Sequence, residues 1–358
     1  MSIIVALIVL IVLIVIHEAG HFWAARSVGC DVYEFSLGFG PLIARWGGKK
    51  PEKGEDDTEE KRNSETQYSL RLFPIGGYVQ IAGMEPGDDN PNGYNYKTPW
   101  QKIKISGAGP VMNFVLAVVL FITIYTFIGV AQKVPTPTVG QVVAGKPAAH
   151  AGLMAGDRIL KIDGVKISTW DQMVQKLKKS PRGHELQLTV KRGKKTFTTS
   201  VMPEYDKSRK TNMLGITSDV KYKRQGLWQG IKYGFVDTYR ITKELLKGFI
   251  MVITGQVSTR SLSGPVGIVK LIGDAAQGGL VYLLNLTAIL SINLGIFNLI
   301  PFPALDGSRI IFAGIESVRG KPVEPEKENM IHLVGFVVLL SLIVLVTYND
   351  IVNIFRGG

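Results

Sequence analysis

The sequence contains a single cysteine, Cys30, in 358 residues. One cysteine excludes an internal disulfide and a zinc site built from several thiolates. No basic residue precedes the first apolar run, whereas a secretory signal peptide begins with a basic segment. We therefore expect no disulfide and no cysteine-based zinc site, and we expect the first apolar run to remain as a membrane span.

Nucleic-acid-binding features are also missing, although the net charge is +12. The 41 basic and 29 acidic residues are scattered over the polar segments, and no aromatic stacking motif accompanies them. Basic loops that face the cytoplasm and anionic lipid account for the charge, so we expect membrane lipid and no nucleic acid as a partner. A hydrophobic fraction of 46% with 20% charged residues favours a membrane protein with a polar domain.

Four apolar runs are long enough to cross a bilayer as helices. They cover about residues 3–26, 108–131, 280–305 and 331–348. The third run is unusual because asparagines and prolines interrupt it, and open backbone inside a membrane is tolerated only where protein or water satisfies it. The predicted fold class is a polytopic α-helical membrane protein with four transmembrane helices.

Two histidines and a glutamate lie within the first run, in the sequence His17-Glu18-Ala19-Gly20-His21. Side chains at i and i+4 share one face of a helix, so His17 and His21 can bind a single Zn²⁺. Glu18 then lies beside the metal, where it can accept a proton. Ionisable residues inside a membrane are costly and usually functional, which favours a zinc site.

A catalytic zinc needs one more protein ligand, and Asp306 is the candidate. It follows the third run in the sequence Asn298-Leu-Ile-Pro301-Phe-Pro303-Ala-Leu-Asp306-Gly307. Prolines cannot continue a regular helix, so the backbone is expected to open where this carboxylate emerges. The alternative is that Asp306 and Gly307 only form a turn that ends the helix.

Basic residues predict the orientation of the spans. Residues 26–107 and 306–330 contain many Lys and Arg residues, whereas nothing before the first run is basic. Loops of this kind stay in the cytoplasm. We therefore expect both termini outside the cytoplasm and the zinc site near the cytoplasmic face of the membrane.

A β-hairpin is expected at residues 66–84, because apolar and polar residues alternate on both sides of a turn near Pro74. Proline and glycine place such a hairpin at the edge of a sheet. An open edge beside the metal can accept an extended peptide as an added strand, although a hairpin that only covers the helices is the alternative. The residues of this edge are Gly76, Gly77, Tyr78 and Val79.

Residues 134–219 have strand and turn patterns that predict a small α+β domain, with a helix near 170–178 and paired strands near 185–191 and 196–202. This segment resembles a PDZ domain of the bacterial permuted kind. The resemblance implies that a loop and strand hold a peptide ligand, although a spacer domain without a ligand is the alternative. The residues of that loop and strand are Leu214, Gly215 and Ile216.

The connecting segment 220–279 is expected to begin with a basic amphipathic helix on the outer membrane surface. Its apolar residues recur near helical spacing and alternate with lysines and arginines. They are Leu227, Ile231, Phe235, Tyr239 and Leu246.

The chain as a whole resembles the bacterial site-2 protease family of the RseP type, whose members are zinc intramembrane metalloproteases. The matching motifs follow the family's order over nearly the whole chain. They are His17 to His21, Phe39-Gly-Pro41, Tyr68 to Gly77, Gly109-Pro-Val-Met-Asn113, the PDZ segment, Gly264-Pro-Val-Gly267 and Asn298 to Gly307.

The resemblance implies that His17, His21 and Asp306 bind zinc and that Glu18 is the catalytic residue. It implies that substrate is handled by Asn298, Pro301 and Pro303. It also implies a protease core made of residues 1–133 and 280–358, in a bacterial inner or plasma membrane.

The implied substrates are single-span membrane proteins, such as anti-sigma factors or remnant signal peptides, which a site-1-type protease has already cut outside the cytoplasm. The PDZ domain would then screen substrates by size or by their new end. The chain departs from the family in two respects. It has room for one PDZ domain where two in tandem are common, and its charged segment 47–65, expected to be flexible, is longer than usual.

Two other functions are alternatives. A non-catalytic scaffold or chaperone would bind membrane proteins through the PDZ domain, and a zinc transporter would use the two histidines and Asp306 as a transit site. Neither function needs a carboxylate next to the first histidine, so Glu18 favours the protease.

Overall fold

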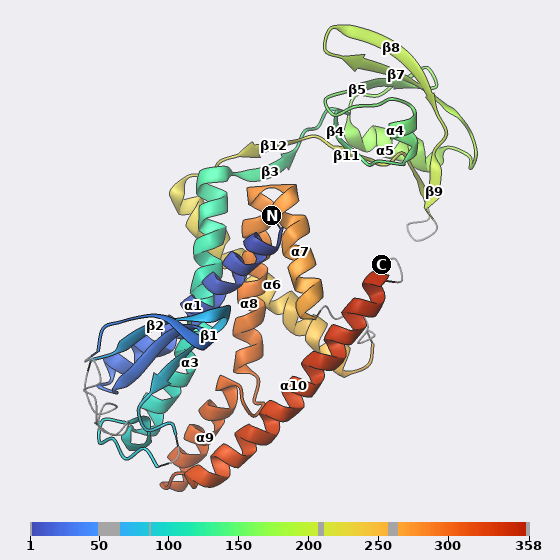
Figure 1. Ribbon diagram of the computed structural model, residues 1–358. Coiled ribbons are helices and arrows are strands. Elements are labelled where there is room, and N and C mark those ends of the chain that lie inside the picture. The colour runs from blue at the N-terminus through green and yellow to red at the C-terminus, as the bar shows by residue number, and fades with distance from the viewer. Residues whose placement is uncertain (1, 49–64, 86, 207–210, 257–263, 356–358) are drawn as a thin grey trace. The chain divides into compact units, whose positions relative to one another are not determined.

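The computed structural model describes residues 2–48, 65–85, 87–206, 211–256 and 264–355 (Figure 1). The chain divides into two units, one made of residues 1–125 and 226–358 and the other of residues 126–225. The second unit is therefore an insertion into the sequence of the first. Most of the charged segment expected to be flexible, residues 49–64, lies outside the described residues.

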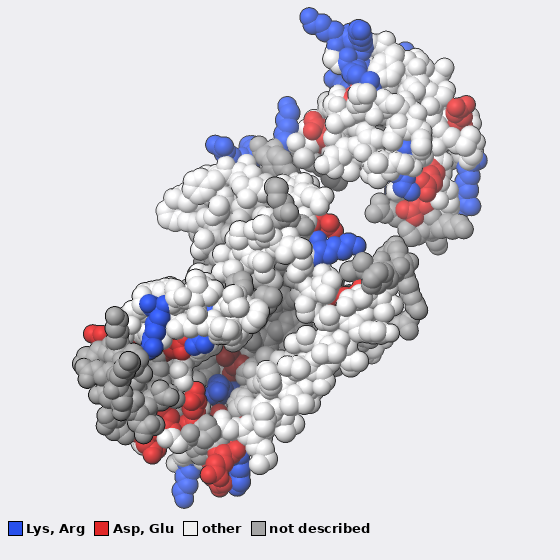
Figure 2. All heavy atoms as spheres, in the orientation of Figure 1, with Lys and Arg blue, Asp and Glu red and all other residues white. Residues whose placement is uncertain are grey.

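Among the described residues of the first unit, four helices are long and apolar enough to cross a membrane, and they correspond to the four predicted runs. They are α1 (Ser2–Ser27), α3 (Pro99–Thr123), α8 (Leu280–Leu299) and α10 (Pro325–Phe355). Figure 2 shows broad surfaces of this unit without Lys, Arg, Asp or Glu, whereas charged side chains gather at the end that carries α9 (Asp306–Arg319). This distribution fits a multi-pass membrane protein.

The third run was predicted to extend to about residue 305 and to open at its prolines; the opening is confirmed, and the helix is shorter than predicted. Helix α8 ends at Leu299, and Ile300 is extended with φ −63° and ψ 138°. The reason is that Ile300 precedes Pro301, and a residue before proline is disfavoured in helical conformation. Residues 300–305 form a loop, and α9 begins directly at Asp306.

Helix α3 begins nine residues before the predicted start of the second span, at a capping box. The Thr98 hydroxyl accepts the N–H of Gln101, the Gln101 side chain accepts the N–H of Thr98, and Pro99 occupies the first turn. These features are typical of a helix start. The helix passes into a π-helical turn, η2 (Ile124–Ile128), which contains the sequence boundary between the two units.

The spans of the first unit pack through small and apolar side chains. Helix α1 contacts α3, α8 and α7 (Pro265–Gly278). Ala6, Val9 and Leu13 of α1 form one buried cluster with Ile272 of α7. Such clusters hold α1, which carries the two histidines, against its neighbours.

The predicted local hairpin is replaced by a larger sheet of two long strands, β1 (Val32–Trp46) and β2 (Gln67–Ile81). Each arm of the expected hairpin pairs with β1 and not with the other arm: Glu34 has both Gln67 and Gln80 as partners. Residues 34–37 thus lie between the two arms of β2. The hairpin prediction failed because β1, at residues 32–46, contributes the partner strand, which local alternation does not show.

Helix α6 (Leu227–Ile253), where an amphipathic helix on the membrane surface was predicted, packs on α3 and α8. Thr238 is buried, and Ile241 and Leu245 pack on the cluster around Phe121 and Ile292. The apolar residues that were predicted to face the membrane include Phe235 and Tyr239, which are 61% and 71% exposed. In a membrane protein such a face can contact lipid, so period alone does not identify the packed side.

The inserted unit is an α+β domain whose four-stranded sheet has the order β6-β5-β7-β8. These strands are Arg158–Ile162 (β5), Val165–Lys166 (β6), Leu186–Arg192 (β7) and Lys195–Val201 (β8). Helix α5 (Trp170–Lys179) supplies Met173 and Leu177 to a core that also contains Ile159, Leu188 and Val190. The predicted helix and paired strands are confirmed.

Short strand pairs complete this domain. Its first and last strands, β3 (Val130–Lys133) and β12 (Val220–Lys223), are antiparallel partners. The other elements are β4 (Val139–Val142) with β11 (Ile216–Ser218), β9 (Glu204–Asp206) with β10 (Thr211–Met213), and the short helix α4 (Pro147–His150).

Candidate metal centre and active site

Two imidazoles converge on the buried side of α1. His17 and His21 are 7% and 9% exposed, and their Nε2 atoms lie 3.2 Å apart. Their rings meet edge to face, with centroids 4.8 Å apart. The i and i+4 spacing therefore produces the shared helical face that the sequence predicts.

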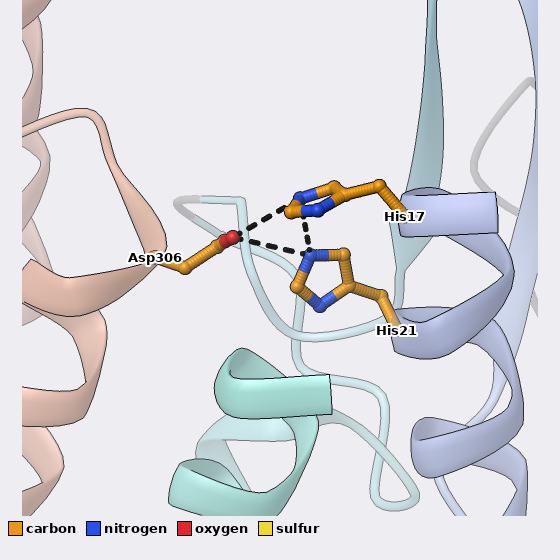
Figure 3. Close-up of side chains that lie close together, drawn as sticks. All are labelled: His17, His21 and Asp306. Atoms are coloured by element: carbon orange, nitrogen blue, oxygen red, sulfur yellow. Dashed lines mark hydrogen bonds and ion pairs between the residues drawn. The ribbon is translucent and has the colours of Figure 1, made fainter. Parts of the chain in front are cut away.

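The Asp306 carboxylate completes the group from the first residue of α9. Its Oδ2 atom lies 3.2 Å from Nε2 of His17 and 3.3 Å from Nε2 of His21 (Figure 3). Three ligand-type atoms from residues almost 290 positions apart thus form a nearly equilateral triangle.

This triangle has the dimensions that zinc requires. A tetrahedral zinc ion with bonds of about 2.0–2.1 Å places its ligand atoms about 3.3–3.4 Å apart. The observed separations are 3.2 to 3.3 Å, and two imidazoles with one carboxylate form a common donor set of catalytic zinc. The residues present therefore fit the metal, and they leave a fourth position for other groups.

The far side of each ring is held by a hydrogen bond. Nδ1 of His21 donates to the backbone carbonyl of Ile105, 2.9 Å away, so its Nε2 lone pair faces the triangle. Nδ1 of His17 lies 3.0 Å from the side-chain amide of Asn113. Partners of this kind fix the orientation of metal-binding imidazoles. Asn113 was not predicted as a site residue, although a polar residue in an apolar span is the pattern that could have identified it.

Glycines allow the helices to approach closely enough to form the site. A Cβ atom at Gly20 would lie 2.5 Å from the carbonyl oxygen of Ala108, which is closer than real Cβ contacts. A Cβ atom at Gly109 would lie 2.2 Å from Nε2 of His21. The position of the imidazole therefore depends on the absence of a side chain at residue 109.

A cavity of about 260 Å³ opens beside the triangle. Among the predicted substrate residues, it is lined by Asn298, Tyr78 and Val79, together with Glu18. Lining residues that the sequence did not indicate are Ile81, Met84, Ser106, Ala304 and Arg309.

The other predicted substrate residues shape the elements around this cavity. Pro301 and Pro303 lie in the loop between α8 and α9. Gly76 has a φ of 128°, and a Cβ atom there would lie 2.1 Å from the ring of Phe39. A Cβ atom at Gly77 would lie 2.9 Å from the carbonyl oxygen of Ser36. The glycines thus permit the bend of β2 close to β1.

Strand β2 also approaches the catalytic glutamate candidate. The backbone amide of Val79 interacts with the Glu18 carboxylate, and the Cβ position of Gly77 is 3.8 Å from Cγ of Glu18. The predicted strand edge therefore lies directly beside Glu18.

Tyr78 is held in the cavity wall by a carboxylate of β1. Its hydroxyl donates to Glu34 over 2.8 Å, and Glu34 also accepts from Arg71 over 2.9 Å and from the Ser69 hydroxyl. Burial would raise the pKa of Glu34, but these three donors lower it below its usual range. Glu34 thus remains charged and fixes the phenol ring.

The predicted peptide-binding loop of the inserted domain is part of its own hydrogen-bonded structure. Leu214 is 2% exposed, and its carbonyl accepts the N–H of Ala148 over 2.8 Å. Gly215 has φ 76° and lines a cavity of about 300 Å³ with Lys146 and Glu204. Ile216 begins β11 and pairs with Val142.

Comparisons with known proteins identify relatives over the whole chain. The model of Peptidase family M50 matches residues 5–342. The zinc metalloprotease RasP of Geobacillus kaustophilus is 32% identical over 435 aligned positions, which cover 99% of this chain and 98% of the relative. The regulator of sigma-W protease RasP of Bacillus subtilis is 32% identical over 426 positions, which cover 96% of each chain.

Both RasP alignments exceed the 358 residues of this chain, so these relatives contain segments that this chain lacks. Among solved structures, the PDZ domain of an SdrC-like protein from Listeria monocytogenes is 27% identical and covers 25% of this chain and 93% of that domain, with a TM-score of 0.22.

Proposed function

This chain belongs to peptidase family M50 and is a zinc-dependent intramembrane metalloprotease, and we propose that His17, His21 and Asp306 bind its zinc ion while Glu18 is its general base. The observation that carries this assignment is the triangle of three ligand atoms 3.2 to 3.3 Å apart. The cavity that contains Glu18 adjoins this triangle.

Zinc, when bound, supplies a Lewis acid that polarises the scissile carbonyl and lowers the pKa of water toward about 7. Glu18 accepts a proton as water adds to the carbonyl carbon, and it returns that proton to the amide nitrogen as the C–N bond breaks. Asn113 and the Ile105 carbonyl keep both imidazoles oriented through these steps.

Strand β2 is proposed to bind the unwound substrate. A helical membrane segment hides its amides, so it must open locally before cleavage, and pairing with a strand edge replaces the hydrogen bonds that it loses. The edge at Gly77 to Val79 lies beside Glu18, which would bring an added strand next to the general base. Asn298, which lines the same cavity, then contacts this segment.

The proposed substrates are single-span membrane proteins that another protease has shortened outside the cytoplasm. The name of the Bacillus relative, regulator of sigma-W protease, supports a regulatory substrate such as an anti-sigma factor. In this scheme the inserted PDZ domain and both termini are outside the cytoplasm and the zinc site is near the cytoplasmic face, because the segments between the spans on that side are rich in Lys and Arg.

Substitution Glu18→Gln tests this function against the alternatives. We expect the variant to keep its zinc and to cleave a co-expressed single-span substrate at least about 100-fold more slowly, which is typical of a lost general base. Glu244→Gln, an exposed glutamate of α6, is the matched control. Cleavage that persists in zinc-loaded Glu18→Gln protein would overturn the proposal, and zinc flux into vesicles would support a transporter.

A further inference from the structure

The loop that carries the third proposed ligand contains a disfavoured backbone conformation. Ala304 has a φ of 74°, in the left-handed region that side chains rarely adopt. It lies two residues before Asp306, where α9 begins. This backbone conformation costs conformational energy in a residue other than glycine. Contacts from outside the loop are therefore needed to stabilise it.

One such contact comes from α10, the last predicted span. The backbone N–H of Ala304 donates a hydrogen bond of 3.0 Å to Nδ1 of His332. The His332 side chain is only 13% exposed, although most of α10 is exposed to its surroundings. The contact therefore joins the loop to a helix that is otherwise little buried.

Two neighbouring contacts hold His332 and the loop in place. The ring of His332 packs on Phe312 of α9, with centroids 5.8 Å apart. One turn further along α10, a Cβ atom at Gly335 would lie 2.3 Å from Cβ of Pro303. Helix α10 thus approaches the loop at two successive positions, and His332 supplies the hydrogen-bond acceptor.

We propose that His332 is a positioning residue for the zinc site, which fixes the loop 300–305 through Ala304 and so holds Asp306 at bonding distance from the metal. This inference rests on the proposed ligand set. It adds α10 to the elements that determine metal affinity. Asp306 directly follows this short loop, so the position of its carboxylate depends on the conformation of the loop.

Two substitutions separate this role from simple packing. His332→Phe keeps a ring against Phe312 but removes the acceptor, whereas His332→Asn keeps an acceptor close to the position of Nδ1. Leu333→Ala is the matched control, since Leu333 is the next residue of α10 and is 63% exposed. Each protein is purified in detergent, stripped of metal and titrated with zinc and with cobalt.

We expect His332→Phe to bind zinc at least about 10-fold more weakly and to shift the visible absorption of the cobalt form, with a change in kcat larger than that in KM. His332→Asn should recover zinc affinity to within about threefold of the parent, and Leu333→Ala should match the parent. Equal zinc affinity and identical cobalt spectra for His332→Phe and His332→Asn would overturn the inference, whether both are normal or both are weakened.

Asp306→Ala, measured in the same titration, separates this inference from the proposed ligand set. If that variant keeps parental zinc affinity, the ligand set fails. If it loses zinc while His332→Phe does not, only the role of His332 fails.

Discussion

Gly109 lies against the edge of the His21 ring, so closely that a Cβ atom there would be 2.2 Å from Nε2 and 2.7 Å from Cε1. Because Nδ1 of the same ring is bonded to the Ile105 carbonyl, the ring cannot move away without losing that bond. Gly109→Ala should therefore weaken zinc binding by about 10-fold or more, as measured by chelator competition.

Gly107→Ala is the control for this prediction. A Cβ atom at Gly107 would meet only the terminal carbon of Ile310, at an ordinary distance of 3.8 Å, and alanine is a better helix former than glycine. We expect parental zinc affinity and a slightly raised melting temperature. A loss of zinc in both variants would mean that α3, and not the His21 ring, is sensitive to added volume.

Substitution Asp306→Ala removes the third proposed ligand. We expect zinc affinity to fall by more than about 100-fold, beyond the range typical of residues that only support a ligand, and cleavage to disappear. Metal analysis of the purified protein gives the stoichiometry. Asp274→Ala, at an exposed aspartate of α7, should keep one zinc per chain, and an unchanged stoichiometry in Asp306→Ala would exclude that residue as a ligand.

Asn298→Ala tests the proposed substrate cavity. Asn298 lines the cavity beside the zinc triangle but contributes no atom to the triangle. We therefore expect turnover of a membrane substrate to fall by about 10-fold or more while zinc affinity stays unchanged. Asn285→Ala, an exposed asparagine on the same helix, is the control. If Asn298→Ala loses zinc as well, its role is in the metal site.

We expect low pH to destabilise the folded state of the inserted domain through Asp157. Burial alone would raise the pKa of this carboxyl, but Arg192 and the N–H of Met154 lower it below its usual value. A carboxyl group whose pKa is lowered in the folded state stabilises that state at pH values above its pKa in the unfolded state, which is about 3.9. This stabilisation is lost as the pH falls through the lower pKa of the folded state.

Hydrogen exchange of the full chain in detergent measures this loss. Asp157 directly precedes β5 and Arg192 ends β7, so the amides of these two strands should lose protection from exchange below about pH 4. In Asp157→Asn the same amides should be less protected at neutral pH, and their protection should change less with acid. Asp171→Asn, at an exposed aspartate of α5, should follow the parent. A parental acid profile in Asp157→Asn would assign the transition to other groups.

The site residues that could be predicted from the sequence are those that follow from helical spacing or from the chemistry of zinc coordination. His17 and His21 could be paired because helical periodicity alone places them on one face. The Asp306 prediction came from coordination chemistry together with the prolines before it, and the structure brings its carboxylate to both imidazoles. These inferences needed no knowledge of the tertiary structure.

Features that depend on contacts between distant segments could not be predicted in this way. The partner of β2 is a strand that begins at Val32, and no local pattern indicates which strand pairs with which. The backing of His17 by Asn113 and the contact of His332 with Ala304 join positions 96 and 28 residues apart. Such pairs are determined by helix packing, so they appear only in the folded chain.

The pairing of β3 with β12 brings the strand that leads into the inserted domain next to the strand that leads out of it. Because these two connections are adjacent, a short peptide linker can replace the domain between them without moving either flanking helix. The inserted domain can therefore be exchanged as one unit. Exchange at this point would allow relatives of different length to carry different inserted domains while the membrane helices stay the same.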